Sequence, residues 1–120
     1  MDTNKTLLIV DDEVAITDAA YQILRDFGYK VFTASNPSAA LKIVEEHGDS
    51  IDLLITDIIM PEMNGDELSK KISLVYPDMK TLFISGYYSD ILSGQAEEYF
   101  LKKPFRMSQL ANKVKTILNC

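Results

Sequence analysis

The stretch LLIVDD at residues 7–12 decides the fold that we expect, because an apolar run stops there on two acids. Three later stretches have the same form: LLITD at residues 53–57, LFIS at residues 82–85, and FLKK at residues 100–103. Short apolar runs bounded by polar residues are typical of buried strands. The carboxyl ends of parallel strands lie along one edge of a sheet, so these terminal polar residues should meet in one crevice.

In the segments between these runs, apolar residues recur at the spacing of a helix. The apolar pattern predicts a helix from Val14 to Phe27, and Gly28 is placed to end it in a left-handed conformation. Asn36 and Pro37 supply the cap and the first-turn proline of a second helix. Apolar spacing carries a third helix as far as Val75. The chain is therefore organised as alternating strands and helices.

Five strands that alternate with five helices predict an α/β fold. The sheet should be parallel and covered on both faces, because right-handed crossovers place helices on each side of it. We expect the fourth helix to be short or mobile, since residues 87–98 are the least periodic part of the chain. A length of 120 residues and a hydrophobic content of 47% suit one domain that spans residues 1–120.

Charge and cysteine content narrow the class of protein. A formal net charge of −6 argues against direct binding to nucleic acid, whose phosphates are neutralised by Lys and Arg. The single cysteine, Cys120, cannot form an internal disulfide, which fits a reducing compartment. The sequence has neither a signal segment nor a run of about 18 apolar residues that would insert in a membrane. We therefore expect a cytoplasmic protein.

Three acids, Asp11, Asp12 and Asp57, should lie close together at the strand ends. Three neighbouring carboxylates cannot all ionise comfortably without a cation, and an all-oxygen set suits Mg2+ or Mn2+, of which we expect Mg2+. Simpler interpretations remain open, because acids are also favoured at the start of a helix and in turns. The conjunction with Ser85 and Lys103 at two further strand ends favours a functional site.

Four segments of the chain carry a resemblance to a known family. The segments are Leu8–Glu13, Thr56–Gly65, Ser85–Gly86 and Lys103–Phe105. In their order and separations they resemble the motifs of a two-component response regulator receiver domain, and the resemblance spans nearly the whole chain. The resemblance implies a (βα)5 doubly wound, flavodoxin-like fold with strand order 2-1-3-4-5. The sequence looks most like receivers fused behind sensor kinases, and a complete single-domain regulator is the alternative.

The resemblance also implies a phosphoacceptor function. Asp57 would take a phosphoryl group from a phosphohistidine on a sensor histidine kinase or a histidine phosphotransfer protein. Asp12 and Asp57 would hold Mg2+ directly, Asp11 would act mainly through water, and the backbone carbonyl of Ile59 would complete the protein ligands. The chain would then catalyse only its own phosphorylation and a slow loss of phosphate, and would not be an enzyme in the ordinary sense.

The chemistry of phosphoryl transfer fits the remaining strand-end residues. As Asp57 attacks phosphorus in line, Mg2+ and the Lys103 ammonium would neutralise charge on the equatorial oxygens, and the Ser85 hydroxyl would bind the new dianion. Side chains alternate along a strand, so only one of the two adjacent lysines can face the pocket. The resemblance selects Lys103 over Lys102 and implies a cis peptide before Pro104.

Receiver domains of this kind relay phosphorylation to an output surface. The resemblance implies that Ser85 moves toward the phosphoryl group and that Phe100, at a position where tyrosine is commoner, turns inward to fill the space. The output partner is unknown. Ile59 and Tyr87 flank the expected path of an attacking water, and an isoleucine cannot form a hydrogen bond to it, so we expect slow self-dephosphorylation.

One departure from the family concerns the last helix. Arg106 stands where a capping Thr, Ser or Asp is common, so the helix should begin later, near Ser108.

Other functions remain open. A phosphohydrolase that forms an aspartyl-phosphate would also use an Asp nucleophile, a Ser, a Lys and Mg2+. Such enzymes resemble a D-x-D pattern, however, and this chain has Ile59 where the second Asp of that pattern would stand. A flavin-binding module would need a Ser/Thr-rich loop after the first strand, where Asp11 and Asp12 would repel a phosphate. A degenerate receiver would act as an interaction module that does not depend on phosphate.

Overall fold

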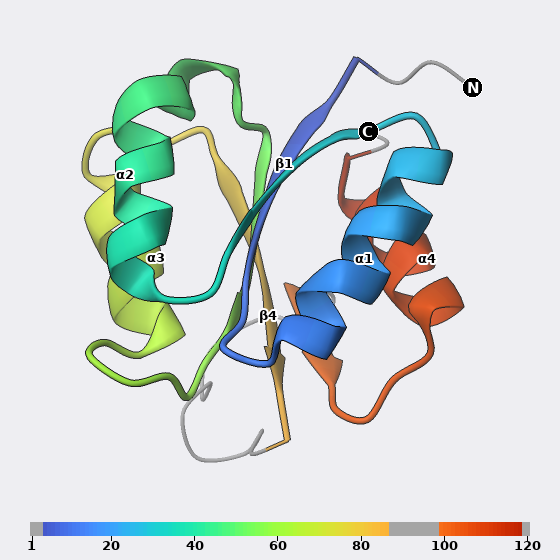
Figure 1. Cartoon of the computed structure of the whole chain (residues 1–120). Helices are drawn as coiled ribbons and strands as arrows, with labels where there is room; N and C mark the ends of the chain where they lie inside the picture. The colour runs from blue at the N-terminus through green and yellow to red at the C-terminus, as the bar shows by residue number, and fades with distance from the viewer. Residues whose placement is uncertain (1–3, 87–98, 119–120) are drawn as a thin grey trace.

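The computed structural model describes residues 4–86 and 99–118 (Figure 1). These residues form one five-stranded parallel sheet, whose strands lie in the order β2-β1-β3-β4-β5. The strands are β1 (Thr6–Val10), β2 (Lys30–Ala34), β3 (Leu53–Asp57), β4 (Lys80–Ser85) and β5 (Phe100–Lys102). The predicted doubly wound α/β fold with strand order 2-1-3-4-5 is confirmed.

Helices cover both faces of the sheet. On one face lie α1 (Val14–Asp26) and α4 (Met107–Leu118), and on the other lie α2 (Pro37–His47) and α3 (Gly65–Ser73) (Figure 1). A short 3-10 turn, η1 (Gly48–Ser50), follows α2. The short or mobile helix predicted for residues 87–98 lies outside the described residues. None of the helices in the described part of the chain has the length and apolarity needed to cross a membrane.

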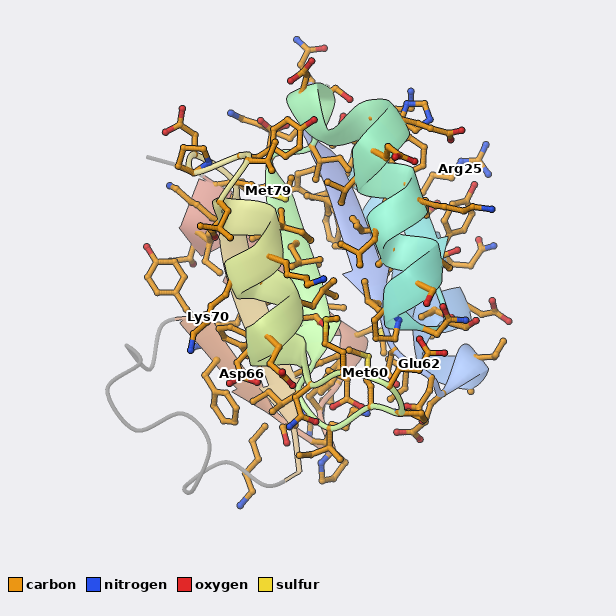
Figure 2. All side chains as sticks on the ribbon, turned by 90° about the vertical axis from the view of Figure 1, so that its left-hand side faces the viewer. Arg25, Met60, Glu62, Asp66, Lys70 and Met79 are labelled. Atoms are coloured by element: carbon orange, nitrogen blue, oxygen red, sulfur yellow. The ribbon has the colours of Figure 1, made fainter. Side chains whose placement is uncertain are left out.

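Alternating strand residues build a separate core on each face. The side of β1 that faces α1 and α4 contributes Leu7 and Ile9, whereas Leu8 and Val10 belong to the core beneath α2 and α3, and all four are fully buried. Met60 and Met79 pack at opposite ends of that second core (Figure 2). A shift of one residue would move every strand side chain into the wrong core, so the register of the sheet is fixed.

The helix boundaries follow local signals in the sequence. Gly28 has a φ of 97°, a left-handed conformation that suits glycine, and Tyr29 N–H donates to the carbonyl of Leu24 at 3.2 Å. At the start of α2, the Asn36 side chain accepts a hydrogen bond from Ala39 N–H at 2.8 Å. The predicted cap of α2 is confirmed, whereas α1 ends at Asp26, one residue before the predicted Phe27, which takes the C-cap position.

The prediction that the third helix reaches Val75 is wrong. The helix α3 ends at Ser73, and the side chain of Val75 is exposed. The chain tightens after Ile72, whose carbonyl accepts a hydrogen bond from Val75 N–H, only three residues along the chain, at 3.0 Å. The ring of Tyr76 then packs against the core beneath α2 and α3, so the aromatic residue takes the place that helical spacing assigned to the valine.

The last helix begins earlier than predicted. It starts at Met107 rather than near Ser108, with Arg106 at the capping position. Although arginine offers no acceptor, the Gln109 side chain accepts a hydrogen bond from Arg106 N–H at 2.7 Å. This is one half of a capping box, and it satisfies a backbone donor at the helix start without a Ser, Thr or Asp.

Candidate functional site

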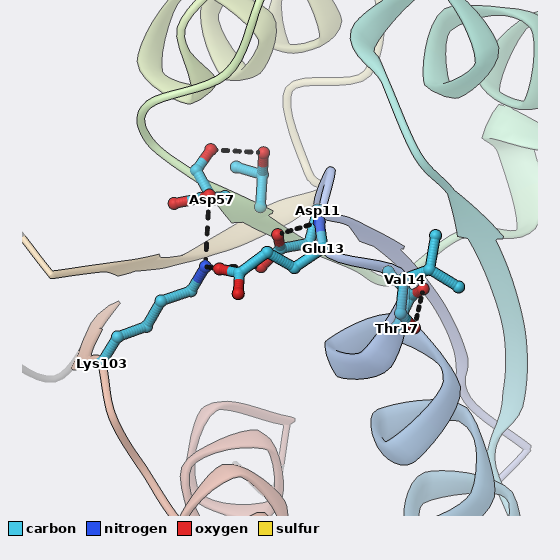
Figure 3. A network of polar contacts seen from close by, with 7 residues as sticks. Asp11, Glu13, Val14, Thr17, Asp57 and Lys103 are labelled. Atoms are coloured by element: carbon cyan, nitrogen blue, oxygen red, sulfur yellow. Dashed lines mark hydrogen bonds and ion pairs between the residues drawn. The ribbon is translucent and has the colours of Figure 1, made fainter.

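The ends of four strands bring their polar residues together at one edge of the sheet. Asp11 directly follows β1, Asp57 and Ser85 end β3 and β4, and Lys103 directly follows β5. The Lys103 Nζ atom lies 2.9 Å from Asp11 Oδ2 and 3.3 Å from Asp57 Oδ2 (Figure 3). Lys103 N–H donates to the backbone carbonyl of Ser85 at 2.9 Å. The expected convergence of strand ends is therefore confirmed.

Strand alternation separates the two lysines as expected. Lys102 is exposed, whereas the Lys103 side chain is largely covered and its ammonium contacts the acids. The peptide bond between Lys103 and Pro104 is cis, as the resemblance implied.

The acids differ in their exposure to water. Asp11 and Asp57 are buried, whereas Asp12 is exposed. Asp11 Oδ1 accepts a hydrogen bond from Glu13 N–H at 2.9 Å, which fixes the Asp11 carboxylate at the start of α1 (Figure 3). The site therefore has two acids held inside the protein and a third at its mouth.

Burial and mutual repulsion change the proton affinities of these groups. Burial, together with the charge of Asp11, raises the pKa of Asp57 to about 6, although Lys103 opposes the shift. Burial also raises the pKa of Asp11. For Lys103, burial acts to lower the pKa, but ion pairs with Glu13, Asp11 and Asp57 outweigh it and hold the ammonium charged. Two buried carboxylates thus share one ammonium, and the site is short of positive charge.

The donor set fits a hard divalent cation. Asp11, Asp12 and Asp57 each offer one carboxylate oxygen, and these oxygens lie within 4.8 Å of one another. Among the described residues, Asp11 Oδ2 has no hydrogen-bond partner of good geometry and is balanced only by the nearby ammonium. Oxygen ligands in this number, with space left for water, suit Mg2+. The residues present therefore fit the Mg2+ ion that is expected from the sequence.

Gly65 holds the loop that follows the phosphoacceptor candidate. Its N–H donates to the carbonyl of Ile58 at 2.7 Å, and a Cβ atom at this position would collide with the backbone carbonyl of Asp57. Only glycine allows this close approach of two backbone segments. The sequence pattern does not reveal this role of Gly65, since a close approach between two backbone segments leaves no local signal.

The predicted switch residues lie beneath the same loop. Phe100 is buried in a small cluster with Ile58 and Phe83, and Ser85 is buried at the end of β4. Ile59 follows Ile58, and its side chain is exposed. Tyr87, which was expected to flank the path of water, lies outside the described residues.

Comparisons with known proteins agree with this geometry. The family model for the response regulator receiver domain matches residues 7–115. The sensor kinase CckA of Brucella abortus is 39% identical over 94% of this chain, which spans only 12% of that protein. The response regulator receiver protein CpdR of the same organism is 30% identical over 95% of this chain and 97% of its own length.

A solved structure gives the same result. The crystal structure of the receiver domain from the hybrid histidine kinase CckA superimposes with a TM-score of 0.81 at 39% identity, and covers 94% of this chain and 98% of that one. The chain therefore belongs to the response regulator receiver domain family and has the phosphoacceptor role of that family in two-component signalling.

Proposed function

We propose that Asp57 accepts the phosphoryl group, and that the donor is a phosphohistidine on a sensor histidine kinase or a histidine phosphotransfer protein. The observation that carries the proposal is the Lys103 ammonium, 3.3 Å from Asp57 Oδ2, beside an acid cluster that lacks positive charge. As an Asp57 oxygen bonds to phosphorus, the bond from phosphorus to the imidazole nitrogen breaks, and its electron pair stays on that nitrogen, which takes up a proton. A pKa of about 6 leaves Asp57 mostly ionised, and so nucleophilic, at neutral pH.

Mg2+ completes the charge balance in this proposal. Asp12 and Asp57 would hold the ion directly, Asp11 mainly through water, and the backbone carbonyl of Ile59 would add a further ligand; Mn2+ has the same ligand preferences. The bound ion supplies positive charge for the phosphoryl oxygens in the transition state. The Lys103 ammonium would neutralise a further phosphoryl oxygen.

Phosphorylation would then change the surface through Ser85 and Phe100. The Ser85 hydroxyl moves toward a phosphoryl oxygen and binds it. Phe100 is already buried against Ile58 and Phe83, so its expected inward turn would repack this cluster rather than begin at the surface. An output partner of still unknown identity reads this change. Residues 1–120 would act as one domain in the cytoplasm, without direct binding to nucleic acid and without insertion in a membrane.

Intact-mass analysis tests the phosphoacceptor. The wild-type domain, incubated with acetyl phosphate and Mg2+, is expected to gain one phosphoryl group, and Asp57→Asn is expected to gain none. Omission of Mg2+ should abolish the gain in wild type, because the buried acids then repel the anionic donor. A folded wild-type domain that gains no phosphoryl group would contradict the proposal and favour an interaction module that does not depend on phosphate.

Ile59 is proposed to make phosphate loss slow. Its side chain is exposed, stands two residues after Asp57, and cannot form a hydrogen bond to an attacking water. Ile59→Asn is therefore expected to lose phosphate up to about tenfold faster, because an asparagine can form a hydrogen bond to the attacking water and one such bond contributes about 1 kcal/mol. The decay of the phosphorylated mass after removal of acetyl phosphate measures this rate, and equal decay in both proteins would contradict the role of Ile59.

A further inference from the structure

The Lys103 ammonium has a third carboxylate partner, Glu13, which the phosphoryl-transfer scheme above does not use. Glu13 Oε1 lies 2.7 Å from Lys103 Nζ, closer than Asp11 Oδ2 at 2.9 Å or Asp57 Oδ2 at 3.3 Å. Figure 3 shows the Glu13 side chain extended from the start of α1 toward the ammonium. The two residues are 90 positions apart, so the tertiary fold creates this contact.

Glu13 stands at the capping position of α1 but does not cap the helix. Its side chain makes no hydrogen bond to the first turn, although this position favours side chains that accept such bonds. The N–H of Glu13 is instead satisfied by Asp11 Oδ1 at 2.9 Å. The Glu13 carboxylate is therefore used for Lys103 and not for the helix.

Three carboxylates surround the Lys103 ammonium. Glu13 and Asp57 accept hydrogen bonds from it, and Asp11 Oδ2 lies 2.9 Å away in an ion pair. A phosphoryl oxygen that pairs with this ammonium has to enter among these carboxylates and compete with them for its charge. The Asp11 and Asp57 side chains are 0% and 9% exposed, whereas the Glu13 side chain is 61% exposed. Glu13 can move into water at the lowest cost, so it is the partner that a phosphoryl group displaces.

We propose that Glu13 is a positioning residue that holds Lys103 in the unphosphorylated domain and competes with the phosphoryl group for its ammonium. The inference rests on the proposed function, because it assigns Lys103 to the phosphoryl oxygens. An ion pair with an exposed partner contributes little stability, so the competition tunes phosphoryl binding without preventing it. Removal of the charge at position 13 should leave Lys103 more available to the phosphoryl group.

Equilibrium binding of beryllofluoride, a noncovalent analogue of the phosphoryl group, tests this competition at saturating Mg2+. Glu13→Gln is expected to bind beryllofluoride about threefold to fivefold more tightly than wild type, which is the change that loss of one exposed ion pair produces. Glu45→Gln is the matched control, because it removes one exposed carboxylate from α2 and should bind like wild type. A merely structural role for Glu13 predicts weaker binding in the variant rather than tighter binding.

The outcomes separate this inference from the function on which it rests. Equal affinities in wild type and Glu13→Gln would overturn the role of Glu13 and leave the proposed function intact. An equal gain in Glu45→Gln would also overturn it, since the effect would then come from net charge. If wild type itself binds no beryllofluoride, the proposed function fails and the inference fails with it. Glu13→Gln is expected to unfold at the wild-type temperature, because Glu13 provides no helix cap.

Discussion

The variant Asp57→Asn is expected to raise the free energy of unfolding of the Mg2+-free domain by about 2–3 kcal/mol at pH 7. Asp57 is buried beside Asp11, and this environment raises its pKa to about 6 from an ordinary value of 3.8. The native state therefore disfavours the charged form that pH 7 imposes. Asparagine has nearly the same shape and carries no charge, so the substitution removes this destabilisation.

The dependence of this effect on pH follows from the direction of the shift. Because the pKa of Asp57 is higher in the folded state, the folded protein binds more protons than the unfolded protein between about pH 4 and pH 6. The stability of wild type should fall as pH rises through that window, whereas Asp57→Asn should lack the part of this fall that Asp57 causes and keep only the contribution of Asp11. The extra free energy of unfolding of Asp57→Asn is thus absent below about pH 4 and reaches its full value above about pH 6.

Urea denaturation across this pH range, in the presence of a chelator, measures the difference. Asp78→Asn, which alters an exposed acid in a turn, is the control and should change stability little. Saturating Mg2+ should reduce or reverse the advantage of Asp57→Asn, because the ion binds the folded wild-type domain through that carboxylate. Equal stability of wild type and Asp57→Asn at pH 7 without Mg2+ would contradict the charge imbalance that we infer.

The variant Lys103→Met is expected to have the largest effect in the opposite direction. It leaves the buried Asp11 and Asp57 without the ammonium that lies within 3.3 Å of both, and loss of one partner from a buried ion pair costs about 3–5 kcal/mol. Mg2+ should restore most of this stability, because it brings positive charge to the same carboxylates. Even at saturating Mg2+, Lys103→Met should take up a phosphoryl group about 100-fold more slowly than wild type. Loss of one donor that stabilises charge in a transition state has an effect of this size.

The neighbouring residue provides a matched control for this experiment. Lys102→Met removes the same charge from an exposed position on β5 and should change neither stability nor phosphoryl uptake appreciably. Urea denaturation with and without Mg2+, followed by the rate of mass gain with acetyl phosphate, measures both effects. If the two methionine variants behave alike, the Lys103 ammonium does not balance the buried acids.

The family assignment decides among the functions that the sequence left open. A match to the receiver model over residues 7–115 supports a phosphoacceptor in signalling over a phosphohydrolase, since it spans almost the entire chain. The acids after β1 argue against a flavin-binding module, because they would repel a phosphate at that position.

The site was predictable from the sequence to the extent that topology determines it. Parallel strands bring their carboxyl ends to one edge, so Asp11, Asp57, Ser85 and Lys103 converge although they are far apart in the chain. Glu13 was not recognised as a partner of Lys103, because an acid at the start of a helix is already explained by the helix dipole. Contacts between surface side chains depend on how distant segments are oriented, which periodicity does not describe.

Helix boundaries were less predictable because neighbouring residues compete for the same role. Val75 and Tyr76 could each have covered the core beneath α2 and α3, and the aromatic side chain does so. Arg106 argued for a later helix start, but the helix starts at Met107, and the Gln109 side chain accepts a hydrogen bond from Arg106 N–H. In both cases the deciding contact is formed by a residue other than the one that the pattern emphasised.

The most direct test of the central claim identifies the phosphorylated residue chemically. Borohydride reduces an acyl phosphate to an alcohol, so treatment of the domain after incubation with acetyl phosphate and Mg2+ converts a phosphorylated aspartate to homoserine. Peptide mass mapping is expected to find homoserine at position 57 and unchanged aspartate at positions 11 and 12. Homoserine at position 11 or 12, or modification at position 57 that does not depend on Mg2+, would contradict the account.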